Sequence, residues 1–339
     1  MKKTLFLKIL KYLLSIIFAF VVIYLLFNNQ DPIKLIKEIQ KTDVKWVGIS
    51  MVFGALAIVI RGIRWITLID ALGYKSSKSN AIASVAIMYF TNLFIPRAGE
   101  ISRCTSLSQV EKIPIDKLFG TILIERVIDF LLLFGLMLLT IILKFEDIIN
   151  FYSIIQAQQA NDANDNYLFL IIIFILIISF FLLRKWLKKS SLYVKTLLFI
   201  EGLKEGFKSI QKMKGKSTFW VHTFSIWVMY FLMTYVCFFS MDETAHLTVS
   251  DGLFLLVLGG IGMVIPTPGG IGSYHAIVMV GLSVLGIGSV IFGEVGNESN
   301  PALLFPTIIH AGQTLMGIML GLVGLLILFV SKKKNNVAS

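Results

Sequence analysis

The sequence predicts an all-α, polytopic transmembrane helix bundle of about six full spans and two interrupted elements. Of its 339 residues, 56% are hydrophobic and only 15% are charged, a balance unsuited to a soluble surface. The apolar residues form runs long enough for bilayer-crossing helices, each of which needs about 20 residues. The basic residues, which give a net charge of +11, collect in the loops and tails between those runs.

Composition also excludes several classes of function. Because the basic residues flank apolar runs, where they set membrane topology, we expect no nucleic-acid partner. The two cysteines, Cys104 and Cys237, are too few for a disulfide scaffold or a cysteine metal site. Nucleophile-elbow, H-E-x-x-H and Walker A patterns do not occur, nor does a carboxylate-rich metal constellation. We therefore expect no catalytic residue, metal or cofactor, and a protein that is not an enzyme.

Six apolar runs are interpreted as full spans of one integral membrane domain, residues 1–339. They cover residues 12–27, 46–60, 118–143, 167–183, 219–240 and 301–330. The first run follows a lysine-rich N-terminus, but it is too long for a secretory signal and is interpreted as a retained span. Two further apolar stretches, residues 79–96 and 252–293, are harder to place.

The positions of Lys and Arg predict the orientation of the spans. Residues 184–216 carry ten basic residues with apolar ones between them, as expected of an amphipathic helix on the cytoplasmic membrane face. Acidic residues dominate the loop 144–166, which should face outward. With the N-terminus inside, eight basic residues flanking the first two spans are cytoplasmic and four lie outside; inversion exchanges these numbers. We therefore expect an inner-membrane protein with both termini in the cytoplasm.

This orientation makes the two unplaced stretches enter the membrane from opposite sides and return. For residues 79–96 a complete span remains the alternative to a re-entrant element. The stretches share a pattern, since IPRAGEIS at 95–102 and IPTPGGIG at 265–272 match at four positions. Residues 12–143 and 167–330 would then be inverted repeats, which are typical of secondary transporters. The alternative is two unrelated helix ends, each terminated by Pro and Gly.

Ionisable residues inside a predicted span are the first functional candidates, since lipid tails cannot solvate charge. The run 118–143 contains Glu125, Arg126 and Asp129. Arg126 and Asp129 are three residues apart, and Glu125 and Asp129 are four apart, so these side chains are neighbours on a helix. Two interpretations stay open: a structural ion pair that locks two helices, or part of a gate or headgroup pathway.

A second charged group contains Arg97, Glu100 and Arg103, at a spacing of three residues, with Gly99 allowing a ligand to approach the backbone. If a helix begins there, the three charged side chains point to one side. The guanidinium group suits bidentate recognition of phosphate or carboxylate, so this group predicts an anion site.

Arg61 and Arg64, also three residues apart, stand at the predicted end of the second span. One interpretation assigns them to the same anion site, for which lipid phosphates are the abundant ligands at a membrane surface. The other is that both arginines extend to interfacial lipid phosphates as ordinary anchors.

A broken segment within 252–293 is the third candidate. The residues that prevent regular helix there are Pro266, Pro268, Gly269, Gly270 and Gly272. Inside a membrane such a segment must be buried in protein or line a wet cavity, where its backbone groups could hold a polar part of the substrate. His275 and His310 are the histidines best placed for proton transfer, although a histidine on an apolar face is more often a core residue.

Four motifs run along almost the whole chain: Arg61-x-x-Arg64-Trp65, Pro96-Arg97-x-Gly99-Glu100-x-x-Arg103, Glu125-Arg126-x-x-Asp129 and Pro266-x-Pro268-Gly269-Gly270-x-Gly272. With them the sequence resembles the lysylphosphatidylglycerol synthase transmembrane-region family of flippase-like membrane proteins. In multiple peptide resistance factors this region is the lipid-flipping part, joined to an aminoacyl-transferring domain. Only nine residues follow Val330, so we expect no synthase domain. The family frequently has an acidic residue after Pro-Gly-Gly, where this chain has Tyr274 and His275, a departure that puts proton or cation coupling there in doubt.

The resemblance implies lipid translocation or the handling of a lipid-linked substrate. We therefore expect a flippase that moves an anionic or lipid-linked headgroup across the cytoplasmic membrane. Its expected partners are a phospholipid or glycolipid substrate and an envelope-lipid biosynthesis enzyme, and a homo-oligomer is compatible with this function. Two alternatives stay open: a membrane-embedded enzyme or accessory subunit acting on lipid-linked substrates, with His275 or Glu125 as acid or base, and a transporter of small anions.

Overall fold

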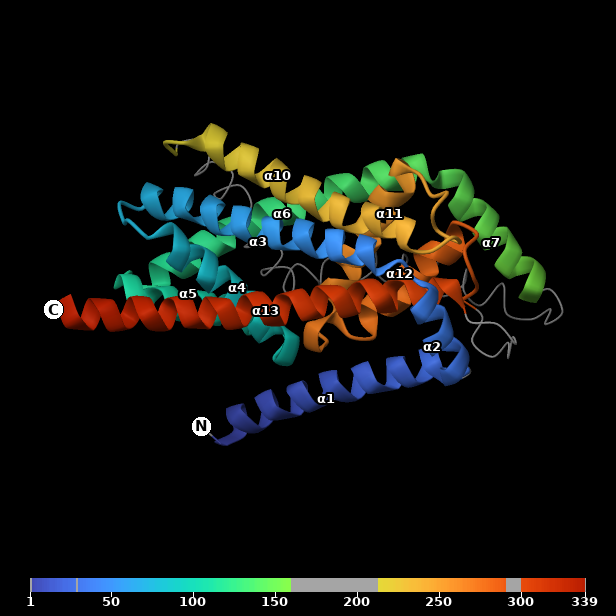
Figure 1. The fold of residues 1–339 in the computed structure, drawn as a ribbon, viewed down its shortest axis with the longest axis horizontal. Helices are drawn as coiled ribbons and strands as arrows, with labels where there is room; N and C mark the ends of the chain where they lie inside the picture. Colours follow the sequence, from blue (N-terminus) through green and yellow to red (C-terminus); the bar gives the residue numbers. More distant parts are fainter. Residues whose placement is uncertain (1, 29, 160–212, 291–299, 339) are drawn as a thin grey trace, which may run out of the picture.

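The computed structural model describes residues 2–28, 30–159, 213–290 and 300–338, and every regular element within them is helical (Figure 1). The helices long and apolar enough to cross a membrane are α3 (Val44–Ala71), α6 (Ile115–Leu143), α10 (Lys216–Tyr235) with the short η1 (Val236–Ser240), and α13 (Pro301–Ala338). The apolar helix α1 (Lys2–Phe27) meets α2 (Pro32–Lys41) at a bend of 86°, and the two make a fifth span if the bent pair is taken as one. The predicted all-α, polytopic class is confirmed. The expected span 167–183 and the basic segment as far as residue 212 lie outside the described residues.

Helix α3 is longer than the run 46–60 from which it was predicted. It continues through Arg61 and Arg64 to Ala71. Both arginines are buried, and carboxylates of another helix neutralise them, so their charge does not end the helix at a membrane surface.

The stretch 79–96 forms the first arm of a helical hairpin. Its arms are α4 (Lys78–Phe94) and α5 (Gly99–Glu111). The backbone N–H of Ser77 donates to the carboxylate of Glu111 at 2.9 Å, so the chain leaves the hairpin where it entered. The tip contains Arg97 in the left-handed region, with φ 62°, a conformation that is uncommon for a residue other than glycine. The stretch therefore turns back within the bundle.

A second hairpin consists of α11 (Val249–Val264), the short η2 (Pro268–Gly270) and α12 (Ser273–Val284). Its arms approach closely where Gly262 faces the backbone of Tyr274. In Figure 1 this hairpin occupies the opposite half of the molecule from α4 and α5, which lie in the half that holds the C-terminus. The two hairpins thus enter the bundle from opposite ends.

The tips of the two hairpins contact each other. Nη2 of Arg97 donates to the carbonyl of Val264 at 3.1 Å, and Gly269 lies against Leu93. Helix α1 also contacts both tips: the hydroxyl of Tyr12 donates to the carbonyl of Phe94 at 3.1 Å, and Gly272 faces residues of α1. Both broken segments therefore lie in one region, which α1 borders.

A salt bridge fastens the end of α6 to the second hairpin. Lys144 pairs with Asp251 in the first turn of α11 and, at 3.2 Å, with Asp147 in α7 (Phe145–Gln159). Burial lowers the pKa of Lys144, but hydrogen bonds to both carboxylates outweigh that effect, so the pKa lies above its ordinary value. The resulting stabilisation is complete below the ordinary lysine pKa of about 10.4 and is lost as the pH rises through the raised pKa.

We expect Asp251→Ala to lower the free energy of unfolding by about 1–2 kcal/mol, since it removes this ion pair and the capping box with Thr248. Thermal unfolding of the purified protein in detergent at neutral pH measures the change. Asp242→Ala, at an exposed position in the loop before α11, is the matched control. Equal unfolding midpoints for the two variants would contradict the fastening role.

Candidate functional site

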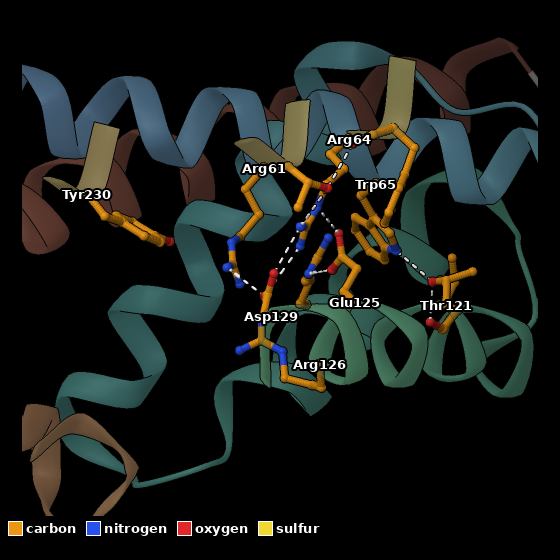
Figure 2. Close-up of polar contacts among 12 residues, drawn as sticks. Arg61, Arg64, Trp65, Thr121, Glu125, Arg126, Asp129 and Tyr230 are labelled. Carbon is orange, nitrogen blue, oxygen red and sulfur yellow. Dashed lines mark hydrogen bonds and ion pairs between the residues drawn. The ribbon is translucent and has the colours of Figure 1, made fainter. Parts of the chain in front are cut away.

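A buried network of ion pairs joins α3 to α6, and Figure 2 shows the side chains of both helices pointing toward each other. Nη2 of Arg61 lies 2.9 Å from Oδ2 of Asp129, and Nη1 of Arg64 lies 2.9 Å from Oδ1. Nε of Arg64 lies 3.3 Å from Oε1 of Glu125. Because each pair of charges is three or four residues apart, each helix presents both members to the other helix.

Helix α5 adds a third arginine to this network. Nη1 of Arg103 lies 2.6 Å from Oε2 of Glu125, and its guanidinium lies 3.8 Å from the centre of the Trp65 ring. The indole N–H of Trp65 donates to Oγ1 of Thr121 at 2.7 Å, which orients the ring. Glu125 therefore holds arginines from two other helices, Arg64 and Arg103.

The buried network carries more positive than negative charge. Among the described residues, Arg61, Arg64 and Arg103 pair with two carboxylates, those of Glu125 and Asp129, which leaves one net positive charge on these side chains. Within the described part of the chain, Nε of Arg61 and both Nε and Nη2 of Arg103 are buried without a hydrogen-bond acceptor. A buried charge without a partner is costly, so this arrangement favours binding of an anion.

Two further charges extend the network toward the surface. Arg126 lies 3.5 Å from Asp129 and 4.0 Å from Glu100, and its side chain is 40% exposed. The buried arginines are thereby linked to a position that solvent or a headgroup can reach.

Arg97 is not part of this network. The sequence predicted that Arg97, Glu100 and Arg103 would share a side if a helix began there, but α5 begins only at Gly99. Arg97 stays in the turn and binds the carbonyl of Val264 instead. The sequence-predicted residues that the structure brings together are Arg61, Arg64, Glu100, Arg103, Glu125, Arg126 and Asp129.

The broken segment of the second hairpin forms a separate polar region. It contains Pro266, Pro268, Gly269, Gly270 and Gly272. Nε2 of His310 donates to the carbonyl of Gly269 at 2.8 Å, and the rings of His275 and His310 are 4.9 Å apart. Two histidines far apart in the sequence thus meet beside this turn.

Sequence reasoning missed two residues of α10 that complete the network. Nη1 of Arg64 donates to Oγ1 of Thr223 at 3.3 Å. The guanidinium of Arg61 lies 6.0 Å from the ring of Tyr230, whose hydroxyl is 2.7 Å from that of Tyr89. Thr223 and Tyr230 are seven residues apart, a spacing of two helical turns that places both on one face. That spacing was a usable signal in the sequence.

The chemistry of the site suits anion exchange. In the described residues, His, Cys, Asp and Glu side chains form no group of three that could hold a metal ion. The carboxylates of Glu125 and Asp129 are each bound by arginines. An entering anion would compete with these carboxylates for the same guanidinium groups, which bind phosphate in the same bidentate manner.

The fold and this network define a multi-pass membrane protein with an ionic site between its helices. A family model described as the lysylphosphatidylglycerol synthase TM region matches residues 12–293, so the chain belongs to that family. The predicted resemblance is therefore confirmed.

Two curated relatives match parts of the chain. One match, over 120 residues, is 32% identical to a UPF0104 membrane protein of Methanocaldococcus jannaschii. This match covers 34% of this chain and 35% of that relative. A second match, over 107 residues, is 29% identical to the glycosyltransferase AglD of Haloferax volcanii. This match covers 31% of this chain and 17% of AglD. The chain thus matches much less than two thirds of either relative's length. No solved structure matches the chain significantly.

Proposed function

We propose that the protein is a flippase that moves an anionic or lipid-linked headgroup across the cell membrane. The observation that carries this proposal is the buried network in which three arginines face two carboxylates. A headgroup phosphate supplies the missing negative charge. Membership of a family with flippase-like members supports the same function.

The network gives this function a physical basis. While no headgroup is bound, Glu125 and Asp129 neutralise most of the arginine charge and make the buried site tolerable in the bilayer. A phosphate adds the negative charge that the three arginines lack, and it can accept from the N–H groups of Arg61 and Arg103 that have no acceptor among the described residues. Hairpins that enter from opposite ends favour alternating access, with residues 12–143 and 167–330 as the proposed inverted repeats.

The proposed setting is the inner membrane, with both chain ends in the cytoplasm. The two termini lie toward the same end of the molecule in Figure 1, which agrees with that topology. Phospholipid or glycolipid is the proposed substrate, and an enzyme of envelope-lipid biosynthesis is the proposed source of it.

Transport of fluorescent lipids in proteoliposomes tests the function, with dithionite bleaching of the outer leaflet as the readout. We expect the wild type to move a phosphatidylglycerol analogue faster than protein-free vesicles do. Arg126→Glu should reduce this rate about fivefold, because reversing a partly exposed charge at the network edge changes anion binding by about 1 kcal/mol.

Lys117→Glu is the matched control for that variant, since it makes the same charge change at an exposed position on α6. A phosphatidylcholine analogue, which has no net charge, should be much less affected by Arg126→Glu. Equal rates for wild-type and protein-free vesicles would overturn the flippase proposal.

The match to a protein named glycosyltransferase favours a second candidate, a membrane enzyme or accessory subunit acting on lipid-linked substrates. The acid or base in that case would be Glu125 or His275. Formation of a chemically new lipid by the purified protein would support this candidate, because a flippase leaves its lipid unchanged. Uptake of a small anion into liposomes without lipid movement would instead support an anion transporter.

A further inference from the structure

The N-terminus of α12 is buried and has no cap. Ser273, Tyr274 and His275 form its first turn and are 3%, 7% and 6% exposed, and no side chain in the described part of the protein caps their amides. Amides in the first turn of a helix have no acceptor within the helix itself. By contrast, the preceding arm of the hairpin, α11, begins with a complete capping box formed by Thr248 and Asp251. The tip of this hairpin therefore presents unpaired donors inside the protein.

A buried imidazole stands beside these amides. Nδ1 of His275 has no hydrogen-bond partner in the described chain, although the residue is 94% buried. Helical side chains lean toward the N-terminus, which directs this ring toward the turn that precedes α12. The ring lies 4.9 Å from that of His310, and Nε2 of His310 holds the carbonyl of Gly269 in the same turn.

The turn before α12 is built from glycines in left-handed conformations, and its side-chain hydroxyls bond to each other and to the turn's own backbone. Gly269, Gly270 and Gly272 all have positive φ, of 58°, 81° and 82°. The hydroxyls of Thr267 and Ser273 lie 2.9 Å apart, and that of Ser273 donates to Gly270, so these hydroxyls are already engaged. The donors that remain are the first-turn amides and the imidazole.

We propose that the N-terminus of α12 and His275 form a second phosphate site, distinct from the arginine network. The amides of residues 273–275 and Nδ1–H of His275 donate to the oxyanion, and the helix dipole adds about half a positive charge. Arg97 adds a full positive charge to the region where the two hairpin tips meet, since it binds the carbonyl of Val264 at the end of α11. This inference rests on the proposed flippase function: the headgroup phosphate of the same lipid binds at both sites as the lipid crosses the membrane.

The position of the site suits a lipid that keeps its tails in the bilayer. Gly272, which precedes α12, faces the carbonyl of Ala19 and the side chain of Val22 on α1. Helix α1 is apolar, and many of its side chains are exposed. A headgroup held at α12 therefore has its exit toward lipid along α1.

Native mass spectrometry of the purified full chain tests this site, with dihexanoyl phosphatidylglycerol as the probe. We expect two equivalents to bind the wild type. His275→Phe keeps an aromatic ring and removes both ring nitrogens, so affinity for one equivalent should fall about tenfold, as expected for loss of a hydrogen bond to a charged group. His275→Asn, which retains a donor near Nδ1, should bind two equivalents.

His246→Phe is the matched control, because His246 is exposed in the loop before α11. A single equivalent on the wild type, or two undiminished equivalents on His275→Phe, would overturn the proposal. A parallel measurement with inorganic phosphate shows whether the site binds lipid phosphate or free phosphate. Binding of free phosphate in place of the lipid would refute a lipid-binding site. If His275→Phe loses one equivalent while the wild type moves no lipid, this site stands and the proposed flippase function fails.

Discussion

Glu125→Ala is expected to destabilise the protein by about 3–5 kcal/mol, the usual cost of breaking a buried ion pair from one side. Glu125 is completely buried and binds Arg64 at 3.3 Å and Arg103 at 2.6 Å. Without it, three arginines would face Asp129 alone, and lipid tails cannot solvate the excess charge. Thermal unfolding in detergent, followed by intrinsic fluorescence, measures the loss.

The control for this variant is Glu100→Ala, at the partly exposed edge of the network, where the expected loss is below about 1 kcal/mol. The double variant Glu125→Leu with Arg103→Met removes a cation together with its anion, so it should recover more than half of the lost stability. Unfolding of Glu125→Ala at the same temperature as Glu100→Ala would show that the network does not hold α5 and α6 together.

The rescue also separates the two interpretations that the sequence left open for these charges. A purely structural network predicts that the rescued double variant moves lipid as fast as the wild type. A substrate network predicts recovered stability with transport still impaired, because Arg103 would be missing. Comparing both readouts on one protein therefore decides between a structural lock and a headgroup site.

Spans were predictable because hydrophobic run length depends on local sequence alone. Five of the six predicted runs coincide with apolar helices, and the sixth lies outside the described residues. The contact between Arg126 and Asp129 was also predictable, since residues three apart on one helix are neighbours. The predicted helix ends were less accurate. The boundary at residue 60 assumed that Arg61 would face the membrane surface, but α3 continues to Ala71.

Contacts between helices could not be derived in this way. Nothing in the spacing of Arg64 and Glu125 shows that α3 packs beside α6, because that depends on the fold of the whole bundle. For Arg97 the spacing suggested a shared helix face that the structure does not have. A spacing of three suggested a common face with Arg103, but the left-handed turn at Arg97 places it before the helix. Periodicity predicts neighbours only where the helix has already begun.

The second large effect is expected in the first hairpin, whose two arms approach closely at Gly99. A methyl group there would overlap the carbonyl oxygen of Met88 and the side chain of Asn92 on α4. Asn92 also accepts a hydrogen bond from the Gly99 amide at 2.8 Å. We therefore expect Gly99→Ala to cost about 1–3 kcal/mol, the range for overpacking a close contact, and unfolding in detergent measures it.

The transport rate of Gly99→Ala should also fall, by more than the loss of folded protein alone would cause. Arg103 lies one turn after Gly99 on α5, so separating α5 from α4 shifts its guanidinium relative to Glu125 and Trp65. Gly135→Ala on α6 is the matched control: nothing lies within 4 Å of the added methyl group, and alanine favours helix by up to about 1 kcal/mol. If both variants were equally stable and equally active, the close approach of α4 and α5 would not be what positions Arg103.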